Sequence, residues 1–247
     1  MKKDLLKFRK EIDLIDKEII DLISRRGTLA KQVGLTKDDG VIYRPEREAQ
    51  ILAALKKYNK GPLKSESIVN IFKAIISNCR ALEKKLSIAF LGPLGTFSEE
   101  ATRQHFGDNI VILPTDSIDE IFSHVQSDIS HYGVVPVENS TEGAVSRTLD
   151  LLLLRELNIC GEISLPVHHC FISKSKVNKG INKIYAHGQS IAQCHDWLTN
   201  NQPNAERIAV SSNAEGAKMA SKDRKAAAIA ISQASELYKL NILSENI

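Results

Sequence analysis

Apolar residues recur in alternating steps of three and four along the first 33 residues, and one place in the series is filled by Arg26. The segment has no proline and its first glycine is Gly27, which is typical of one long amphipathic helix. A helix from about Lys3 to Gln32 is about 45 Å long, and its heptad seam needs a helical partner. Because a small monomeric domain cannot cover such a helix, we expect a homodimer. The seam consists of Leu5, Phe8, Ile12, Ile15, Ile19, Leu22, Leu29 and Val33.

Two arginines lie on or beside this seam. Because Arg26 faces a helical core, its guanidinium needs a carboxylate from a ligand or from the protein, and a register-setting pair with a glutamate is the alternative. Arg9 flanks the same stripe, where a solvated or snorkelling side chain is the alternative to a ligand contact.

Charge is unevenly distributed. Residues 1–86 hold 20 Lys and Arg against 12 Asp and Glu, whereas residues 87–247 hold 13 against 18, so the two parts carry net charges of +8 and −5. The basic residues alternate with acids, and aromatic residues make up 5% of the chain. This pattern favours a small anionic ligand over a nucleic acid.

Two further helices are predicted in the first 86 residues. The sequence KDDG at 37–40 ends the first helix, and Pro45 begins the second at the first helical position, with acids in the first turn. A third helix is predicted from about Ser65 to Leu86, because apolar residues repeat along one face. The predicted domain of residues 1–86 is therefore all-α and three-helical.

The pattern changes at Ser87 to strands that alternate with helices. Strands are predicted at 87–91, 110–113 and 134–137, and helices at 99–106 and 117–125. This order predicts a mostly parallel sheet covered by helices on both faces. The absence of GxGxxG and GxxxxGK motifs from the sequence argues against a dinucleotide or nucleoside triphosphate ligand.

The stretch from Gly133 to Leu154 predicts a buried strand, then a polar loop, then a helix. A loop at the carboxyl end of a strand that leads into a helix N-terminus is where open α/β sheets bind ligands. The alternative is an ordinary turn in which Ser140 or Thr141 is the N-cap.

A second α/β segment follows, with strands predicted at 163–172, 183–186, 207–210 and 226–231 and helices at 190–198 and 213–220. The long strand at 163–172 is the candidate crossing between two lobes. Two lobes joined by such crossings leave a cleft suited to a small ligand.

The four cysteines are far apart and have no CxxC spacing, which favours reduced thiols in a cytoplasmic protein over disulfides or a metal site. No metal and no cofactor is predicted. No apolar run reaches membrane-spanning length, so no membrane partner is predicted either.

Residues 3–86 resemble the helical chorismate mutase domain at the start of the bifunctional P-proteins. The resemblance rests on FRKEIDLIDKEIIDLISRR, Lys37, YRPEREAQIL and IFKAIISNCRALE. It implies that Arg9 and Arg26 bind the carboxylates of chorismate, with one of them reaching in from the partner subunit. Lys37 would bind the ether oxygen, and Arg47 and Glu48 would position the ring hydroxyl and carboxylate contacts.

The reaction implied is an intramolecular rearrangement, which needs a conformational clamp and positive charge at the ether oxygen rather than a nucleophile. Glu83 falls where family members carry Gln or Glu as a second donor to that oxygen. Because a glutamate donates only when protonated, we expect mutase activity to decline as pH rises. A solvated acid within the Glu-Lys-Lys run is the alternative for Glu83.

Residues 87–247 resemble prephenate dehydratase, whose catalytic domain is two-lobed like type II periplasmic binding proteins. The blocks that carry the resemblance are GPLGTFSEEA, VPVENSTEGAVSRTLDLL, IYAHGQSIAQCHDWL and VSSNAEGAKMA. It implies a prephenate cleft with neutral hydroxyl and amide donors, which suits a dianionic substrate that loses CO2 and hydroxide. The implied cleft residues are Thr96, Ser98, Asn139, Ser140, Gln189, Ser212 and Asn213. For Thr96 and for Ser212, each considered by itself, the alternative is a role as a helix cap.

Members of this family continue into a Thr-Arg-Phe motif, regarded as essential to dehydration, and an ACT domain that binds phenylalanine. The sequence to Ile247 contains neither, so we expect a weakened dehydratase without the usual feedback inhibition. The resemblance implies chorismate mutase and prephenate dehydratase activities in phenylalanine biosynthesis. The alternative is a chorismate mutase whose second domain binds prephenate without catalysis or supports the dimer.

Overall fold

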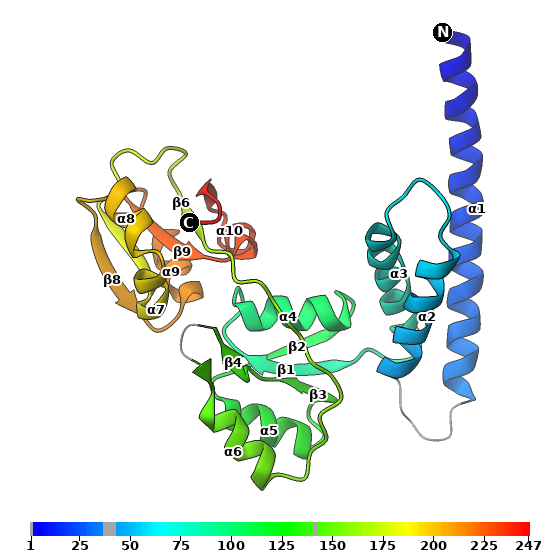
Figure 1. The fold of residues 1–247 in the computed structure, drawn as a ribbon, viewed down its shortest axis with the longest axis horizontal. Helices are drawn as coiled ribbons and strands as arrows, with labels where there is room; N and C mark the ends of the chain where they lie inside the picture. The colour runs from blue at the N-terminus through cyan, green and yellow to red at the C-terminus, as the bar shows by residue number, and fades with distance from the viewer. Residues whose placement is uncertain (1, 37–42, 141–142) are drawn as a thin grey trace. The chain divides into compact units, whose positions relative to one another are not determined.

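The computed structural model describes residues 2–36, 43–140 and 143–247. They form two compact units, one of Met1–Ser87 with Phe106–Val111 and the other of Ile88–His105 with Ile112–Ile247. The first unit is built from helices, and the second is built around two sheets (Figure 1). The predicted fold class, a helical domain followed by a two-lobed α/β domain, is confirmed.

Three helices form the first unit: α1 is Lys2–Leu35, α2 is Pro45–Tyr58 and α3 is Ser65–Arg80. Pro45 is the first residue of α2, as predicted. The third helix ends at Arg80 rather than at Leu86. The carbonyl of Leu86 accepts a hydrogen bond from Val111 N at 2.8 Å, so the chain has already left the helix to pair with the next strand.

Two glycines bring α1 close to the end of α3. A Cβ added at Gly27 would lie 3.0 Å from Leu82 Cδ1, and one at Gly34 would lie 2.7 Å from Glu83 Cγ. The predicted seam of α1 is not covered within the single chain, because its side chains are 46% to 64% exposed.

The first sheet of the second unit has the strand order β2-β1-β3, and β1 pairs with β3 in parallel. Its strands are β1 (Ser87–Leu91), β2 (Val111–Thr115) and β3 (Tyr132–Val134). Its helices are α4 (Phe97–Phe106), α5 (Ile118–Gln126) and α6 (Ser146–Leu154).

The predicted strand-loop-helix stretch at 133–154 is wrong in two respects. First, β3 ends at Val134, since Pro136 has no N–H to donate to a neighbouring strand. Second, β4 (Glu138–Asn139) and β5 (Gly143–Ala144) pair as an antiparallel hairpin before α6 begins. The N-cap of α6 is therefore Val145, not Ser140, and Thr141 lies outside the described residues.

The second sheet has the order β10-β6-β9-β7-β8. Strand β7 is parallel to β8 and β9, whereas β6 is antiparallel to β9 and β10. The strands are β6 (Cys170–Ser173), β7 (Lys183–His187), β8 (Glu206–Val210), β9 (Ala226–Ala230) and β10 (Asn241–Ser244). The helices are α7 (Gly188–Gln193), α8 (His195–Asn201), α9 (Asn213–Ala220) and α10 (Ser232–Tyr238).

The core of this lobe lies on both faces of β9, whose five residues are all buried. Ala226, Ala228 and Ala230 belong to a cluster with α9 and α10, and Ala227 and Ile229 belong to one with α8. Small side chains on the central strand let both helix layers approach closely. This second sheet is therefore covered by helices on both faces.

Two predictions for this lobe are corrected, and two elements were missed. The long strand at 163–172 is wrong, since only Cys170–Ser173 is a strand and residues 156–169 connect the lobes without regular structure. The helix at 190–198 is two helices, because Cys194 has φ −95° and ψ 15° and interrupts them. Helix α10 and strand β10 were not predicted.

Candidate active sites

The last turn of α3 gathers polar side chains of the first unit. Arg80 is 7% exposed, and its Nη1 donates to Oε1 of Glu48 on α2 at 2.5 Å. Half-buried Glu83 lies just beyond and packs against Gly34 of α1. Half-buried Arg26 precedes Gly27 on the same helix. The end of α3 thus lies next to Glu48 of α2, and the residues that follow it pack against α1 at Gly27 and Gly34.

Arg9 on α1 and Arg47 on α2 are exposed, and Lys37 lies outside the described residues. Arg9 and Arg26 are separated along the single uninterrupted helix α1 by about 25 Å. A substrate the size of chorismate cannot contact both arginines of one copy of α1.

The first lobe of the second unit places Thr96 and Ser98 where β1 leads into α4. Thr96 Oγ1 lies 3.4 Å from Leu91 O and accepts from Glu99 N at 3.4 Å, so it also caps the helix. Gly95 N donates to Glu99 Oε2 at 2.7 Å, which closes the loop. The backbone carbonyl of Ser98 accepts from Thr102 Oγ1 at 2.7 Å.

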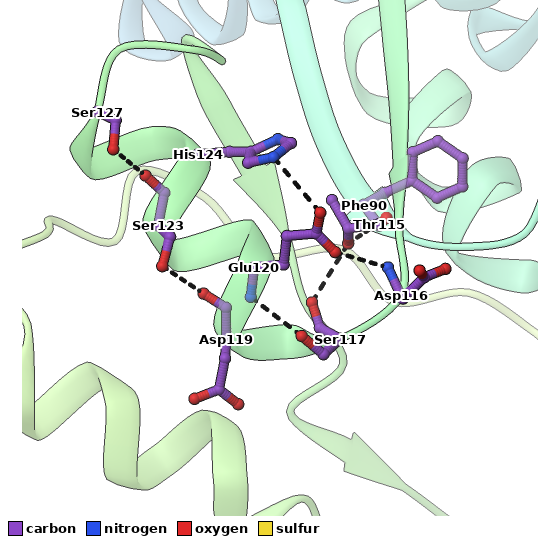
Figure 2. Close-up of polar contacts among 9 residues, drawn as sticks. All are labelled: Phe90, Thr115, Asp116, Ser117, Asp119, Glu120, Ser123, His124 and Ser127. Carbon is purple, nitrogen blue, oxygen red and sulfur yellow. Dashed lines mark hydrogen bonds and ion pairs between the residues drawn. The ribbon is translucent and has the colours of Figure 1, made fainter.

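A polar network missed from the sequence lies at the next strand end, where β2 leads into α5 (Figure 2). Thr115 Oγ1 lies 3.1 Å from Phe90 O of β1. Ser117 Oγ accepts from Glu120 N at 3.2 Å, and Glu120 Oε2 accepts from Asp116 N at 2.9 Å. The S-x-x-E spacing is the capping signal that would have predicted it. The network stabilises the edge of the sheet and contains none of the predicted cleft residues.

Asn139 and Ser140 lie in the β4–β5 hairpin region that follows β3. Asn139 pairs with Gly143 in the hairpin and is half-buried, whereas Ser140 is exposed. The hairpin holds Asn139 in place at this point. Behind it, Thr148 Oγ1 of α6 donates to Pro136 O at 2.6 Å.

The second lobe brings Gln189, Ser212 and Asn213 together at the carboxyl ends of β7 and β8, because these two parallel strands are neighbours. Asn213 Oδ1 accepts from His187 N at 2.9 Å, and its Nδ2 donates to Ser190 Oγ at 2.8 Å. Ser212 Oγ accepts from Glu215 N at 3.1 Å, so the predicted cap alternative also holds for this residue.

Gln189 is the residue in this cluster with an unused donor. Its backbone N donates to His187 Nδ1 at 3.4 Å, but its side-chain Nε2 is buried and has no hydrogen-bond partner among the described residues. Buried polar atoms are normally paired, so an unpaired buried donor such as this one is uncommon in a folded protein.

The two lobes of this unit contact each other through α4. Phe97 packs edge-on against buried His169 at 5.6 Å between ring centroids, and Gln233 Nε2 donates to Glu100 Oε1 at 3.2 Å. A cavity of about 200 Å³ beside these contacts is lined by residues including His168, Cys170 and Ser232, and by none of the predicted cleft residues.

The four cysteines are reduced thiols. Burial raises the pKa of Cys194 to about 11 and also raises the pKa of Cys170. Both are therefore protonated at neutral pH and unsuited to nucleophilic catalysis. Within the described ranges, none of the helices has the length and apolar character needed to cross a bilayer.

Two families of known proteins match separate parts of the chain. Residues 8–84 match the chorismate mutase type II family, and residues 88–247 match the prephenate dehydratase family. The bifunctional chorismate mutase/prephenate dehydratase of Stutzerimonas stutzeri is 46% identical over 247 residues, which cover 97% of this chain and 68% of that protein. The protein of the same name from Aquifex aeolicus is 39% identical, with 99% and 69% covered.

Among solved structures, the chain is similar to a prephenate dehydratase from Arthrobacter aurescens, determined in complex with L-Phe. The TM-score is 0.61 at 32% sequence identity, and the match covers 66% of this chain and 55% of the other.

Proposed function

Because the chain belongs to the family of bifunctional chorismate mutase/prephenate dehydratases, we propose that residues 1–86 and 87–247 are the two catalytic domains. The enzyme is an isomerase and a lyase in phenylalanine biosynthesis. The mutase converts chorismate to prephenate, and the dehydratase converts prephenate to phenylpyruvate, CO2 and water. Its four reduced cysteines support a cytoplasmic location.

In the proposed mutase site, Arg9 and Arg26 clamp the two substrate carboxylates and Lys37 binds the ether oxygen, where negative charge develops in the transition state. Glu83 donates a second hydrogen bond to this oxygen, and Arg47 and Glu48 orient the ring. The clamp holds chorismate in the reactive conformation. Binding energy therefore lowers the entropic cost of reaching the transition state.

Arg9 and Arg26 are about 25 Å apart along α1 of one chain. We therefore propose that each mutase site is shared between two chains. A second copy of α1 brings its own Arg9 toward the Arg26 of the first. The exposed seam, at 46% to 64%, supports the same homodimer, since pairing would bury these side chains.

The pH dependence of the mutase tests Glu83. Because a carboxyl group donates only when protonated, kcat/KM for chorismate should decline as pH rises. Glu83→Gln should flatten this profile, since an amide donates at every pH, whereas the neighbouring control Lys84→Gln should keep the decline. A flat profile in the unmodified enzyme would remove Glu83 from the proposed role.

For the dehydratase we propose that Thr96, Ser98, Asn139 and Ser140 of the first lobe face Gln189, Ser212 and Asn213 of the second across the prephenate cleft. Neutral donors bind the two carboxylates without holding them as tightly as fixed charges would, and one of them assists the departing hydroxide. The buried, unpaired Nε2 of Gln189 is the main support for this proposal.

Gln189→Met tests the cleft. The variant removes a donor that has no protein partner, so the free energy of unfolding should stay unchanged or rise, while kcat/KM for prephenate falls about tenfold or more. Gln202→Met is the matched control, because Gln202 Nε2 donates to Asn178 O at 3.3 Å and its loss should lower stability but not turnover. An unchanged kcat/KM in Gln189→Met would contradict the assignment.

A further inference from the structure

Arg80 is a buried cation at the end of α3, and it contacts three parts of the helical unit. Its Nη1 donates to Glu48 Oε1 at 2.5 Å, and its Nη2 donates to Phe106 O at 2.5 Å. The guanidinium also lies over the ring of Tyr43, 4.8 Å from the ring centroid. Phe106 packs against the same ring, with 5.2 Å between centroids.

The planar guanidinium of Arg80 fixes the directions of its two hydrogen bonds relative to each other. Its donors form a rigid planar fork, so fixing one nitrogen on Phe106 O fixes the direction in which the other presents its hydrogen. Glu48 Oε1 is thereby held, while Oε2 has no hydrogen bond to any described residue. A lysine, which presents a point charge on a flexible chain, would not impose this orientation.

The carbonyl that holds Arg80 belongs to Phe106, which lies beyond the predicted mutase domain of residues 1–86. Phe106–Val111 belongs to the same compact unit as the three helices. Ser77 Oγ donates to Phe106 O at 3.0 Å, and Asn109 Nδ2 lies 3.4 Å from Asn78 Oδ1. The Phe106 carbonyl therefore accepts from two side chains of α3 and is fixed in position.

We propose that Arg80 is a positioning residue of the chorismate mutase site, which holds Glu48 for the substrate by bridging it to the backbone of Phe106. The proposal rests on the role given above to Glu48. It also implies that residues 106–111, which lie in the dehydratase part of the sequence, are structural support for the mutase.

A double-mutant cycle on the full chain tests the proposal. Arg80→Gln should lower kcat/KM for chorismate about tenfold in the wild-type background and less than about twofold in a Glu48→Gln background, because the two residues act as a unit. Arg80→Lys, which keeps the charge and one donor, should fold and give an intermediate rate. Equal losses in both backgrounds would overturn the proposal, since Arg80 would then act only through the fold.

Ser77→Ala is the matched control, because it removes the other hydrogen bond to the same carbonyl without touching Glu48. It should lower the melting temperature and leave kcat/KM for chorismate unchanged. A loss of kcat/KM equal to that of Arg80→Gln would also overturn the proposal. If Glu48→Gln alone leaves kcat/KM unchanged, the role of Glu48 itself is wrong and Arg80 positions nothing in the reaction.

Discussion

At the scale of single residues, Gly107 leaves the least room for a side chain among the glycines of the described chain. It has a positive φ of 81°, and an added Cβ would lie 2.2 Å from Ser77 Oγ. The backbone therefore turns at this point in a conformation that L side chains rarely adopt, and it passes directly over α3. The contact brings Phe106 within reach of Ser77 and Arg80.

Gly107→Ala should destabilise the helical unit for two reasons. The left-handed backbone costs about 1–2 kcal/mol for a residue with a Cβ, and the forced shift of Ser77 adds about 1–3 kcal/mol. Gly180→Ala is the control, since Gly180 has a φ of 88° but nothing within 4 Å of an added Cβ. Denaturant unfolding of both variants measures the difference, and equal losses would contradict the close packing on Ser77.

The burial of Arg80 and its contacts could not be predicted from the sequence. In the sequence it is one basic residue in the last turn of a helix, where cations are common. Its burial depends on a carbonyl 26 positions further along the chain. Gln189, Ser212 and Asn213 were recognised by resemblance, but their shared position follows from β7 lying beside β8, a long-range pairing that no local pattern specifies.

At the scale of elements, local sequence patterns predicted the bounds of the helices better than those of the strands. Helix α9 begins after Ser212 and spans Asn213–Ala220 as predicted, because its cap and its apolar face are both local. The strand predicted at 134–137 failed because one proline removes a ladder donor. The strand predicted at 163–172 failed because apolar composition does not reveal whether a neighbouring strand is present to pair with it.

Helices α5 and α6 are joined by an ion pair that is sensitive to pH. The hydrogen bond from Arg147 lowers the pKa of the Asp119 carboxyl, and the guanidinium charge lowers it further. A lowered carboxyl pKa stabilises the folded state above the unfolded pKa, and this contribution is lost as pH falls through the folded pKa.

The free energy of unfolding should therefore be higher in wild type than in Asp119→Asn at about pH 7, and the difference should shrink toward about pH 3. The effect should also weaken with salt, since both side chains are about half exposed. Asp116→Asn, an exposed residue of the same junction, is the control for general charge effects. A difference that stays constant across this pH range would contradict the role of the ion pair.

At the scale of the whole molecule, one chain joins two catalytic units whose chemistry is complementary. The mutase part is basic, as suits the clamping of a dianion by arginine and lysine, and the dehydratase cleft is proposed to use neutral donors. The product of the first reaction is the substrate of the second. The mutase site, however, is proposed to need two chains, because one copy of α1 keeps Arg9 and Arg26 about 25 Å apart.

Subunit mixing tests this shared site most directly. Arg9→Ala and Arg26→Ala should each abolish chorismate consumption, while each variant still forms phenylpyruvate from added prephenate. When the two variants are unfolded together and refolded, half of the dimers should be mixed, and each mixed dimer should hold one site with both arginines. Mutase activity should then recover to about a quarter of the wild-type level. No recovery in mixed dimers would contradict a mutase site built from two chains.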